Sequence, residues 1–151
     1  CPLTRRRAEG ENRALPPSLI GGCQCGAVRY EITAEPIRLA ACHCSECQKQ
    51  SGSAFGISMK IPAASLKVTG ALKSFTRTAD SGHPNTAMFC PECGNRIYNV
   101  PGYAEDVVNV KPGTLDDTAW LSPDMIVWHE RAQGWVPLPD GMPVFDRQPP
   151  G

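Results

Sequence analysis

The sequence predicts a mainly β domain whose modest core is supplemented by bound metal. Its 14 glycines and 15 prolines among 151 residues favour turns and short strands over long helices. Between these turn residues, apolar and polar residues alternate in short segments, as they do in half-buried strands. Seven of its eight cysteines fall into three compact groups with the spacing of metal ligands. A chain of this length is most simply one domain.

The strand segments are bounded by glycine, proline or cysteine turns. In order they are residues 27–33, 37–44, 53–61, 87–100, 107–113 and 124–130. The CPECG turn in the fourth segment is expected to direct backbone N–H groups at the sulfurs.

Short helical turns are expected in three places. The first covers residues 45–53, with Ser45 as a possible cap and Gly52 as the stop. Residues 63–78 are predicted to hold a helical turn and a hairpin through Gly70. Another turn is expected in 115–121, and the proline-rich tail is expected to pack as extended coil around Trp135 and Phe145.

Residues 1–17 are interpreted as a flexible leader and 18–151 as a single zinc-binding domain. Cys1, in the leader, is expected to be a free thiol. The formal charge is zero, which argues against a nucleic-acid partner. No stretch approaches the roughly 20 apolar residues of a membrane span, and no apolar secretion signal follows the Arg triplet. A cytoplasmic location is therefore predicted.

Four cysteines offer a complete structural metal site. Cys23 and Cys25 form a CxC, and Cys90 and Cys93 form a CxxC, separated by residues 26–89. Four thiolates are what a closed tetrahedral zinc site requires. Without a secretion signal, metal binding is favoured over disulfides. An ion held by these four residues would close a long loop and contribute folding energy.

The remaining group, Cys42, Cys44 and Cys47, offers only three ligands. Three protein ligands and one open position are the arrangement of a catalytic zinc. An incoming thiol could take the open position, lose its proton to become a thiolate, and attack a small electrophile or depart from carbon. The alternative is that these are reduced cysteines beside the structural site, or that a distant histidine closes the site.

No spacing rule selects the residues around the trio. His83 or His129 could be a fourth ligand, whereas His43 is expected to point away from its neighbours. Glu46 and His43 flank the ligands and could act as general acid or base, or could simply be solvated. Nearby cations would offset the negative charge of the thiolates, and the candidates are Lys49, Lys60 and Arg96.

These motifs resemble the glutathione-dependent formaldehyde-activating enzyme family, which includes the centromere-protein-V-like proteins. The resemblance covers about residues 20–146 and rests on GGCQCGAVRYEI, CHCSECQKQSGSAF, FCPECGNRIY and the ending WLSPDMIVW…GWVPLPDGMPVF. Either cysteine pair alone would be weak, but the three-part pattern with this ending is highly specific. One departure is Met88, where many relatives carry a basic residue, and it bears on the glutathione contacts.

The resemblance implies an Mss4-like fold of several small coiled antiparallel sheets around a structural zinc. It also implies two zinc ions per chain, with Cys23, Cys25, Cys90 and Cys93 at the structural zinc and Cys42, Cys44 and Cys47 at the catalytic one. The activity it implies is that of a carbon–sulfur lyase acting on glutathione or other small-thiol conjugates, such as the formaldehyde adduct. A homodimer is possible.

Two other functions compete with this one. A non-catalytic zinc module for protein interaction would need no open metal position, and the sequence has no evident interaction patch. A methionine-sulfoxide reductase would need a nucleophilic cysteine beyond the zinc ligands, and only Cys1 is spare. The sequence therefore favours an enzyme whose partner is a small thiol or thiol conjugate, with neither nucleic acid nor membrane.

Overall fold

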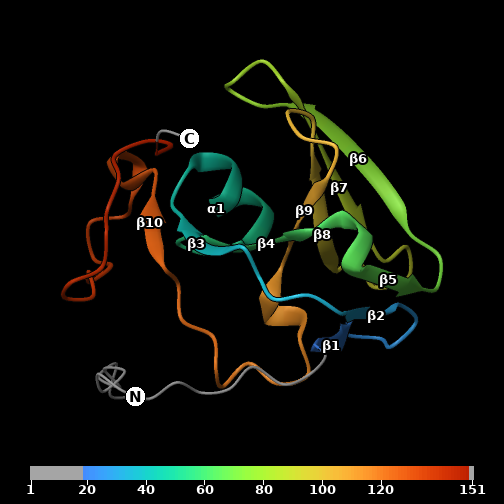
Figure 1. Ribbon diagram of the computed structural model, residues 1–151. Helices are drawn as coiled ribbons and strands as arrows, with labels where there is room; N and C mark the ends of the chain where they lie inside the picture. The colour runs from blue at the N-terminus through green and yellow to red at the C-terminus, as the bar shows by residue number, and fades with distance from the viewer. Residues whose placement is uncertain (1–18, 150–151) are drawn as a thin grey trace.

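The structure is a computed structural model that describes residues 19–149 (Figure 1). Within them lie ten strands, one α-helix and three short 3-10 helices. The strands are β1 (Leu19–Gly22), β2 (Arg29–Ile32), β3 (Arg38–Cys42), β4 (Gly56–Pro62), β5 (Leu66–Thr69), β6 (Lys73–Thr78), β7 (Pro84–Phe89), β8 (Arg96–Pro101), β9 (Val107–Val110) and β10 (Met125–Val127). The helices are α1 (Ser45–Ser51), η1 (Ala63–Ser65), η2 (Pro112–Thr114) and η3 (His129–Arg131).

The strands form two sheets. The smaller has the order β1-β2-β5 and the larger the order β10-β3-β4-β9-β8-β7-β6. Every pair of neighbouring strands is antiparallel except β10 with β3. The prediction of a mainly β protein with small antiparallel sheets is confirmed. None of the helices among residues 19–149 has the length and apolar character needed to cross a membrane.

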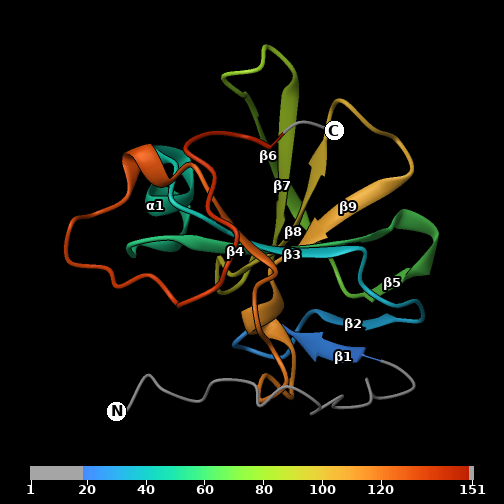
Figure 2. The same cartoon turned by 60° about the vertical axis from the view of Figure 1, so that its left-hand side comes forward.

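The apolar core joins the two sheets. Tyr30 and Ile32 of β2 pack in one cluster with Met59 of β4 and Val110 of β9, and all four are buried. Leu115, which follows η2, closes the same cluster. Figures 1 and 2 show the small sheet lying together at one end of the molecule, apart from α1.

The larger sheet has two unlike faces. Directly paired residues share a face, and one cross-sheet row is apolar throughout: Leu39, Met59, Val110, Tyr98 and Met88. This row belongs to the face that lies on the core. The adjacent row points to the other face, and it is polar across β4, β9 and β8. Helix α1, which directly follows β3, lies against that second face, where a Cβ at Gly56 would meet Cys47.

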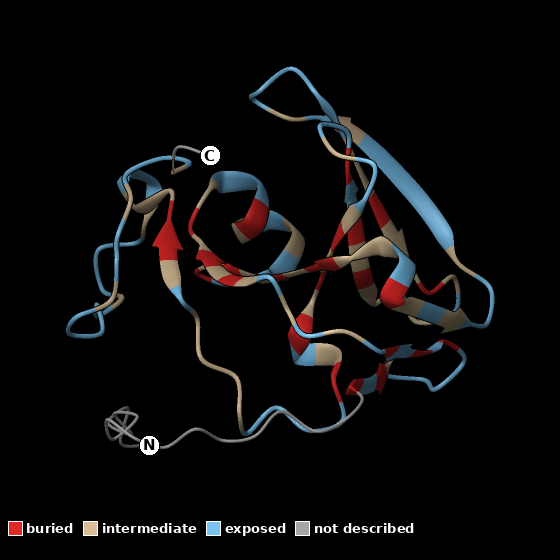
Figure 3. Cartoon of the chain, viewed as in Figure 1, coloured by how far each residue is buried: buried red, intermediate tan, exposed pale blue. Residues whose placement is uncertain are grey.

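The hairpin predicted through Gly70 is wrong. β5 pairs with β2 and β6 pairs with β7, so Gly70 connects the two sheets instead of two paired strands. Its φ of 105° lies in the left-handed region, and a Cβ there would lie 2.2 Å from the carbonyl oxygen of Ala27. This crossing therefore requires glycine. Figure 3 shows β6 exposed along most of its length, at the outer edge of the larger sheet.

Replacing Gly70 tests this crossing. Gly70→Ala is expected to lower the free energy of unfolding by about 2–4 kcal/mol, because the new Cβ adds backbone strain and a steric clash. Urea unfolding measures the change. Gly113→Ala is the matched control, since a Cβ at Gly113 meets open space at an ordinary φ. Equal effects at the two positions would contradict this account of the crossing.

The helical predictions are partly corrected. α1 forms where expected and ends at Gly52 (φ 63°), but its N-cap is Cys44 and not Ser45. Residues 115–121 contain only a turn, closed by the Leu121 N–H on the carbonyl of Thr118. The short helix lies just before them, because Pro112 at its first position supplies a helical φ.

The tail follows an extended path, as predicted, but only one of its two aromatic residues anchors it. Phe145 donates its backbone N–H to the carbonyl of Ile126, and Val144 forms a parallel bridge with the same residue. Trp135 is 72% exposed, so the expectation that the tail packs around this indole is wrong.

Candidate metal centres

The first cluster joins two turns that are far apart in the sequence. Cys23 and Cys25 lie in the β1–β2 turn, and Cys90 and Cys93 lie in the β7–β8 turn. Their four sulfurs all lie within 4.8 Å of one another, with Cys23–Cys25 at 3.5 Å and Cys25–Cys90 at 3.7 Å. With Zn–S bonds of about 2.3 Å, the sulfurs of a tetrahedral site are about 3.8 Å apart. The arrangement fits one zinc ion with all four positions filled.

Backbone geometry builds this cluster. Gly26 (φ 81°) and Gly94 (φ 77°) adopt left-handed conformations that fold each turn back on itself. The Gly26 N–H bonds the Cys23 carbonyl at 3.2 Å, and the Gly94 N–H bonds the Cys90 carbonyl at 2.9 Å. The Val28 N–H donates to Cys23 Sγ at 3.2 Å. Backbone N–H groups are therefore available to stabilise thiolates.

Hydrogen bonds from backbone N–H groups lower the pKa values of two of these thiols. Burial opposes ionisation of Cys23, but the Val28 N–H and the neighbouring thiols lower its pKa to about 6. The pKa of Cys93 is also lowered, mainly by the backbone N–H of Asn95. Asn95 further connects the two turns, because its Oδ1 accepts a 3.1 Å hydrogen bond from the Gln24 N–H. A thiol must lose its proton to bind a metal, and the lowered pKa values of Cys23 and Cys93 favour that loss.

The second cluster is local in sequence. Cys42 ends β3, Cys44 caps α1 and Cys47 lies in the first turn of α1. Their sulfurs lie within 4.8 Å of one another. Among residues 19–149, no further His, Cys, Asp or Glu ligand atom completes this set within that distance. The trio thus fits a metal ion that keeps one position free for a ligand.

Hydrogen bonds within the trio favour a thiolate at Cys44. The thiols of Cys42 and Cys47 bond its sulfur and hold the pKa of Cys44 well below its usual range. The Cys47 N–H also donates to that sulfur, at 3.3 Å. The same contacts raise the pKa of Cys42, because its thiol is the proton donor in this arrangement. These contacts therefore favour loss of the trio's first proton at Cys44.

One amide and one of the three predicted cations are connected to the trio by hydrogen bonds. Gln50 donates to Cys47 Sγ at 3.4 Å, and Arg96 donates from Nη1 to Gln50 Oε1 at 2.8 Å. Arg96, one of the three predicted cations, is thus connected to the trio. Lys49 is exposed on α1, and the ammonium of Lys60 lies 5.6 Å from the ring centroid of Tyr103.

Lys111 is the cation that the sequence did not single out. It follows β9, is partly buried, and donates from Nζ to Ser58 Oγ at 3.4 Å. Burial lowers the pKa of Lys111, while its Coulomb interactions with Cys47 and Cys42 oppose this effect. Alternation along the predicted strand 107–113 already puts Asn109 and Lys111 on one face. The sequence does not show that this strand pairs with β4, and it is that pairing which brings Lys111 close to the trio.

Gly56 provides the close approach between α1 and β4. It pairs with Cys42, and a Cβ at this position would lie 3.4 Å from Cys47 Cβ and 3.8 Å from its sulfur. A larger side chain here would therefore press on the trio from the sheet side.

Comparison with known proteins decides the family. The profile of the glutathione-dependent formaldehyde-activating enzyme family matches residues 18–131. The chain belongs to this family. A crystal structure of a Rhodobacter sphaeroides protein shares the fold, with a TM-score of 0.54 at 22% identity over 67% of this chain and 91% of that one.

Three curated relatives carry the family's name. An Emericella nidulans protein is 34% identical over 87 residues, 54% of this chain and 44% of its own length. A Halomonas elongata protein is 25% identical over 126 residues, 80% of each chain. A Sordaria macrospora protein is 29% identical over 101 residues, 63% of this chain and 41% of its own. The chain therefore matches less than half the length of the two fungal relatives.

The histidines of this family member stay away from the trio. His43 lies between Cys42 and Cys44 in extended backbone, so it faces the opposite side, as predicted, but it is buried and not at the surface. Its ring lies 5.0 Å from that of Phe55 and 6.1 Å from that of His129. Burial lowers the pKa of His43, and the charge of His129 adds to the effect.

The other predicted site residues also occupy defined positions. Glu46 pairs with Arg77 of β6 at 3.7 Å, and its side chain is about half exposed. His83 is exposed in the β6–β7 loop. Met88, the departure from the family pattern, lies opposite Tyr98 on the core face of the larger sheet. An apolar side chain suits that position, and it does not alter the face that carries the trio.

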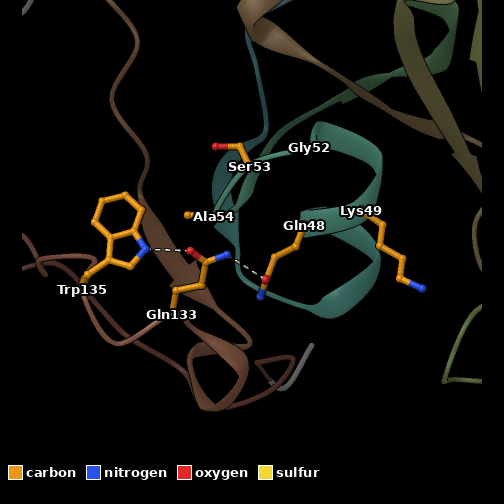
Figure 4. Close-up of a pocket in the computed structure, with 7 residues that line it drawn as sticks. All are labelled: Gln48, Lys49, Gly52, Ser53, Ala54, Gln133 and Trp135. Atoms are coloured by element: carbon orange, nitrogen blue, oxygen red, sulfur yellow. Dashed lines mark hydrogen bonds between the residues drawn. The ribbon is translucent and has the colours of Figure 1, made fainter.

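A separate hollow lies beside α1, with a volume of about 500 Å³. Figure 4 shows Trp135 at one side of it, with its indole N–H donating to Gln133 Oε1 at 2.7 Å and the Gln133 amide donating to Gln48 Oε1 at 3.1 Å. None of the seven clustered cysteines lines this hollow. Its residues are Gln48, Lys49, Gly52, Ser53, Ala54, Gln133 and Trp135.

Proposed function

We propose that this protein is a zinc-dependent carbon–sulfur lyase acting on conjugates of glutathione or another small thiol, such as the formaldehyde adduct. The observation that carries the proposal is the trio of Cys42, Cys44 and Cys47, whose three sulfurs lie within 4.8 Å of one another with no fourth His, Cys, Asp or Glu ligand atom among the described residues beside them. Membership of the formaldehyde-activating family supports the same chemistry. In this proposal the four-cysteine cluster holds a structural zinc and the trio a catalytic one.

The metal would supply an open Lewis-acid position that lowers the pKa of an incoming thiol. The protein's own residues hold and orient this site. Gln50 fixes the Cys47 sulfur by its hydrogen bond, and Arg96 fixes Gln50 in turn. Lys111 places a positive charge against the thiolates and offsets part of their negative charge.

The reaction itself forms or breaks one bond to carbon. In the forming direction, the substrate's thiolate sulfur adds to the carbonyl carbon of formaldehyde and the carbonyl oxygen takes up a proton. Cleavage is the reverse, in which the hydroxyl proton is lost and the C–S electron pair returns to sulfur. The surrounding cations stabilise the sulfur anion that both directions require.

Native mass spectrometry of the metal-loaded protein, with and without glutathione, tests the proposal. We expect two zinc ions per chain and a glutathione adduct on the holo form. Glutathione disulfide, which has no free thiol, is the control and is expected to give no adduct through the open position. Zinc at only one cluster after metal reconstitution, with no adduct, would instead support a non-catalytic zinc-binding interaction module.

A further inference from the structure

The two edges of the larger sheet end differently. β10 forms one edge, and the tail covers it: Val144 bridges Ile126, and the Phe145 N–H donates to the carbonyl of Ile126. β6 forms the other edge, and within residues 19–149 no strand pairs with its outer side. Figure 3 shows this strand exposed along most of its length. The tail therefore closes one edge, and the other is open.

Every second residue of β6 turns its backbone N–H and carbonyl groups away from β7. At the end of the β6–β7 hairpin, the Ala79 N–H donates to the carbonyl of His83 at 2.8 Å, so this pair is hydrogen-bonded across the hairpin. Along antiparallel strands such pairs alternate with pairs whose backbone groups point outward. Pro84, opposite Thr78, agrees, because it has no N–H and its carbonyl accepts from Gly102 instead. The outward residues are Ser74, Thr76 and Thr78.

The open edge is regular. The pairs of β6 with β7 keep one unbroken register, whereas the register shift at Met88/Phe89 lies between β7 and β8. β6 also contains no proline. Bulges and prolines are two of the devices by which proteins prevent another strand from pairing with an edge. The backbone of β6 is therefore able to pair with a further strand.

The side chains beside this edge determine which strand can pair with it. Lys73, Phe75 and Arg77 lie on one face of β6, and Phe75, between the two cations, is 54% exposed. Their backbone groups point toward β7, so in a pair with a new strand they would occupy non-hydrogen-bonded positions. Side chains approach most closely at such positions. A strand can therefore bind only if its side chains suit two cations and an aromatic ring.

The cations disfavour a second copy of this chain. If two β6 strands paired antiparallel about Phe75, Lys73 of each would lie opposite Arg77 of the other. Pairing about Thr76 instead would place the two Arg77 side chains diagonal to each other. Like charges that face each other across strands are destabilising. An acidic strand would be attracted in either direction, because the cations flank Phe75 on both sides.

This chain supplies little negative charge to the open edge. Glu46 of α1 lies 3.7 Å from Arg77, but within residues 19–149 Lys73 forms no ion pair. Residues 1–18 contain four arginines and two glutamates, so the charge of that segment does not complement β6. The complementary charge must therefore come from another molecule.

We propose that the open edge of β6 binds an extended acidic segment of another protein, which joins the larger sheet as a further strand. The segment would carry acidic side chains two residues before and two residues after a central apolar one, opposite Lys73, Phe75 and Arg77. Its main chain would form hydrogen bonds with the outward N–H and carbonyl groups of β6. This interaction surface is additional to the proposed function and involves neither cysteine cluster.

Two blocked seven-residue peptides test the proposal. Both have valine at the centre and threonine at every odd position, and they carry either glutamate or lysine at the second and sixth positions. Each peptide is titrated into the isotope-labelled, zinc-loaded full chain. Binding is followed by NMR chemical shifts and by hydrogen exchange of the outward amides at Ser74, Thr76 and Thr78.

The glutamate peptide is expected to bind at least about tenfold more tightly than the lysine peptide and to slow exchange at the outward amides. Lys73→Glu is expected to weaken the glutamate peptide by about threefold to tenfold and to strengthen the lysine peptide, because attraction between exposed charges becomes repulsion. Thr76→Pro removes an outward N–H that the β6–β7 pairing does not use, and it is expected to abolish binding. Lys67→Glu, the control, alters an exposed lysine on β5 of the other sheet and should change neither peptide.

Three results would overturn the proposal. If the glutamate peptide does not bind, Lys73 and Arg77 only keep the edge unpaired. Binding without slower exchange at the outward amides would mean that the peptide contacts the cations without adding a strand. Slower exchange on raising the protein concentration alone would identify a second copy of this chain as the occupant.

Discussion

Cys93→Ser is expected to abolish the cooperative unfolding transition of this protein. The substitution removes one of the four thiolates that join the β1–β2 turn to the β7–β8 turn. Structural zinc sites contribute apparent binding free energies of about 10–16 kcal/mol, which matches or exceeds the about 5–15 kcal/mol by which whole domains are stable. Near-UV circular dichroism and urea unfolding, together with zinc content, measure the loss.

The control for this variant is a cysteine-to-serine substitution in the trio. Cys44→Ser changes the same atom and leaves the four-cysteine cluster complete. A Cys93→Ser protein that keeps its near-UV spectrum and unfolding midpoint, and loses an ion only from the trio, would show that the structural assignment is wrong.

Cys44→Ser is expected to leave a folded protein that has lost one zinc ion and all thiol-adduct activity. Cys44 caps α1 by accepting the Cys47 N–H, and a serine hydroxyl performs this capping well. The fold should therefore survive while the trio is reduced to two thiolates. Zinc stoichiometry, glutathione binding and the unfolding midpoint check the three parts of this expectation.

Two results would contradict it. Unfolding of Cys44→Ser would mean that the trio, and not the four-cysteine cluster, is the structural centre. Retention of two zinc ions with full adduct formation would mean that Cys44 is not a ligand. Cys23→Ser offers a comparison in the other cluster, where loss of folding is expected.

The sequence predicted what depends on neighbours in the chain. The strand around Met59 and the helix ending at Gly52 follow from alternation and from local turn chemistry. The division of the cysteines into four and three also followed from spacing, because CxC and CxxC pairs can converge on one ion.

Partner choice between strands was not predictable in the same way. The segment around Gly70 had the pattern of a hairpin, yet β5 and β6 belong to different sheets. The role of Lys111 depends on which strand lies beside β9, and nothing local to VVNVKPG specifies β4. Trp135 was expected to pack because it is large and apolar, but its indole N–H bonds Gln133 near the surface. The first two cases arise from long-range strand pairing that local propensity does not encode.

The two clusters also differ in when they can form as the chain is made. The trio lies within Cys42–Cys47, whereas the other cluster needs residues from both Cys23–Cys25 and Cys90–Cys93. At about 5–20 residues per second, Cys90 is synthesised about 3–13 s after Cys25. Throughout that interval the first pair of thiols lacks Cys90 and Cys93, and once Cys47 has been made the trio is the more complete chelator on the nascent chain. The four-sulfur cluster, which joins the two sheets, can then form only after the β7–β8 turn has emerged from the ribosome.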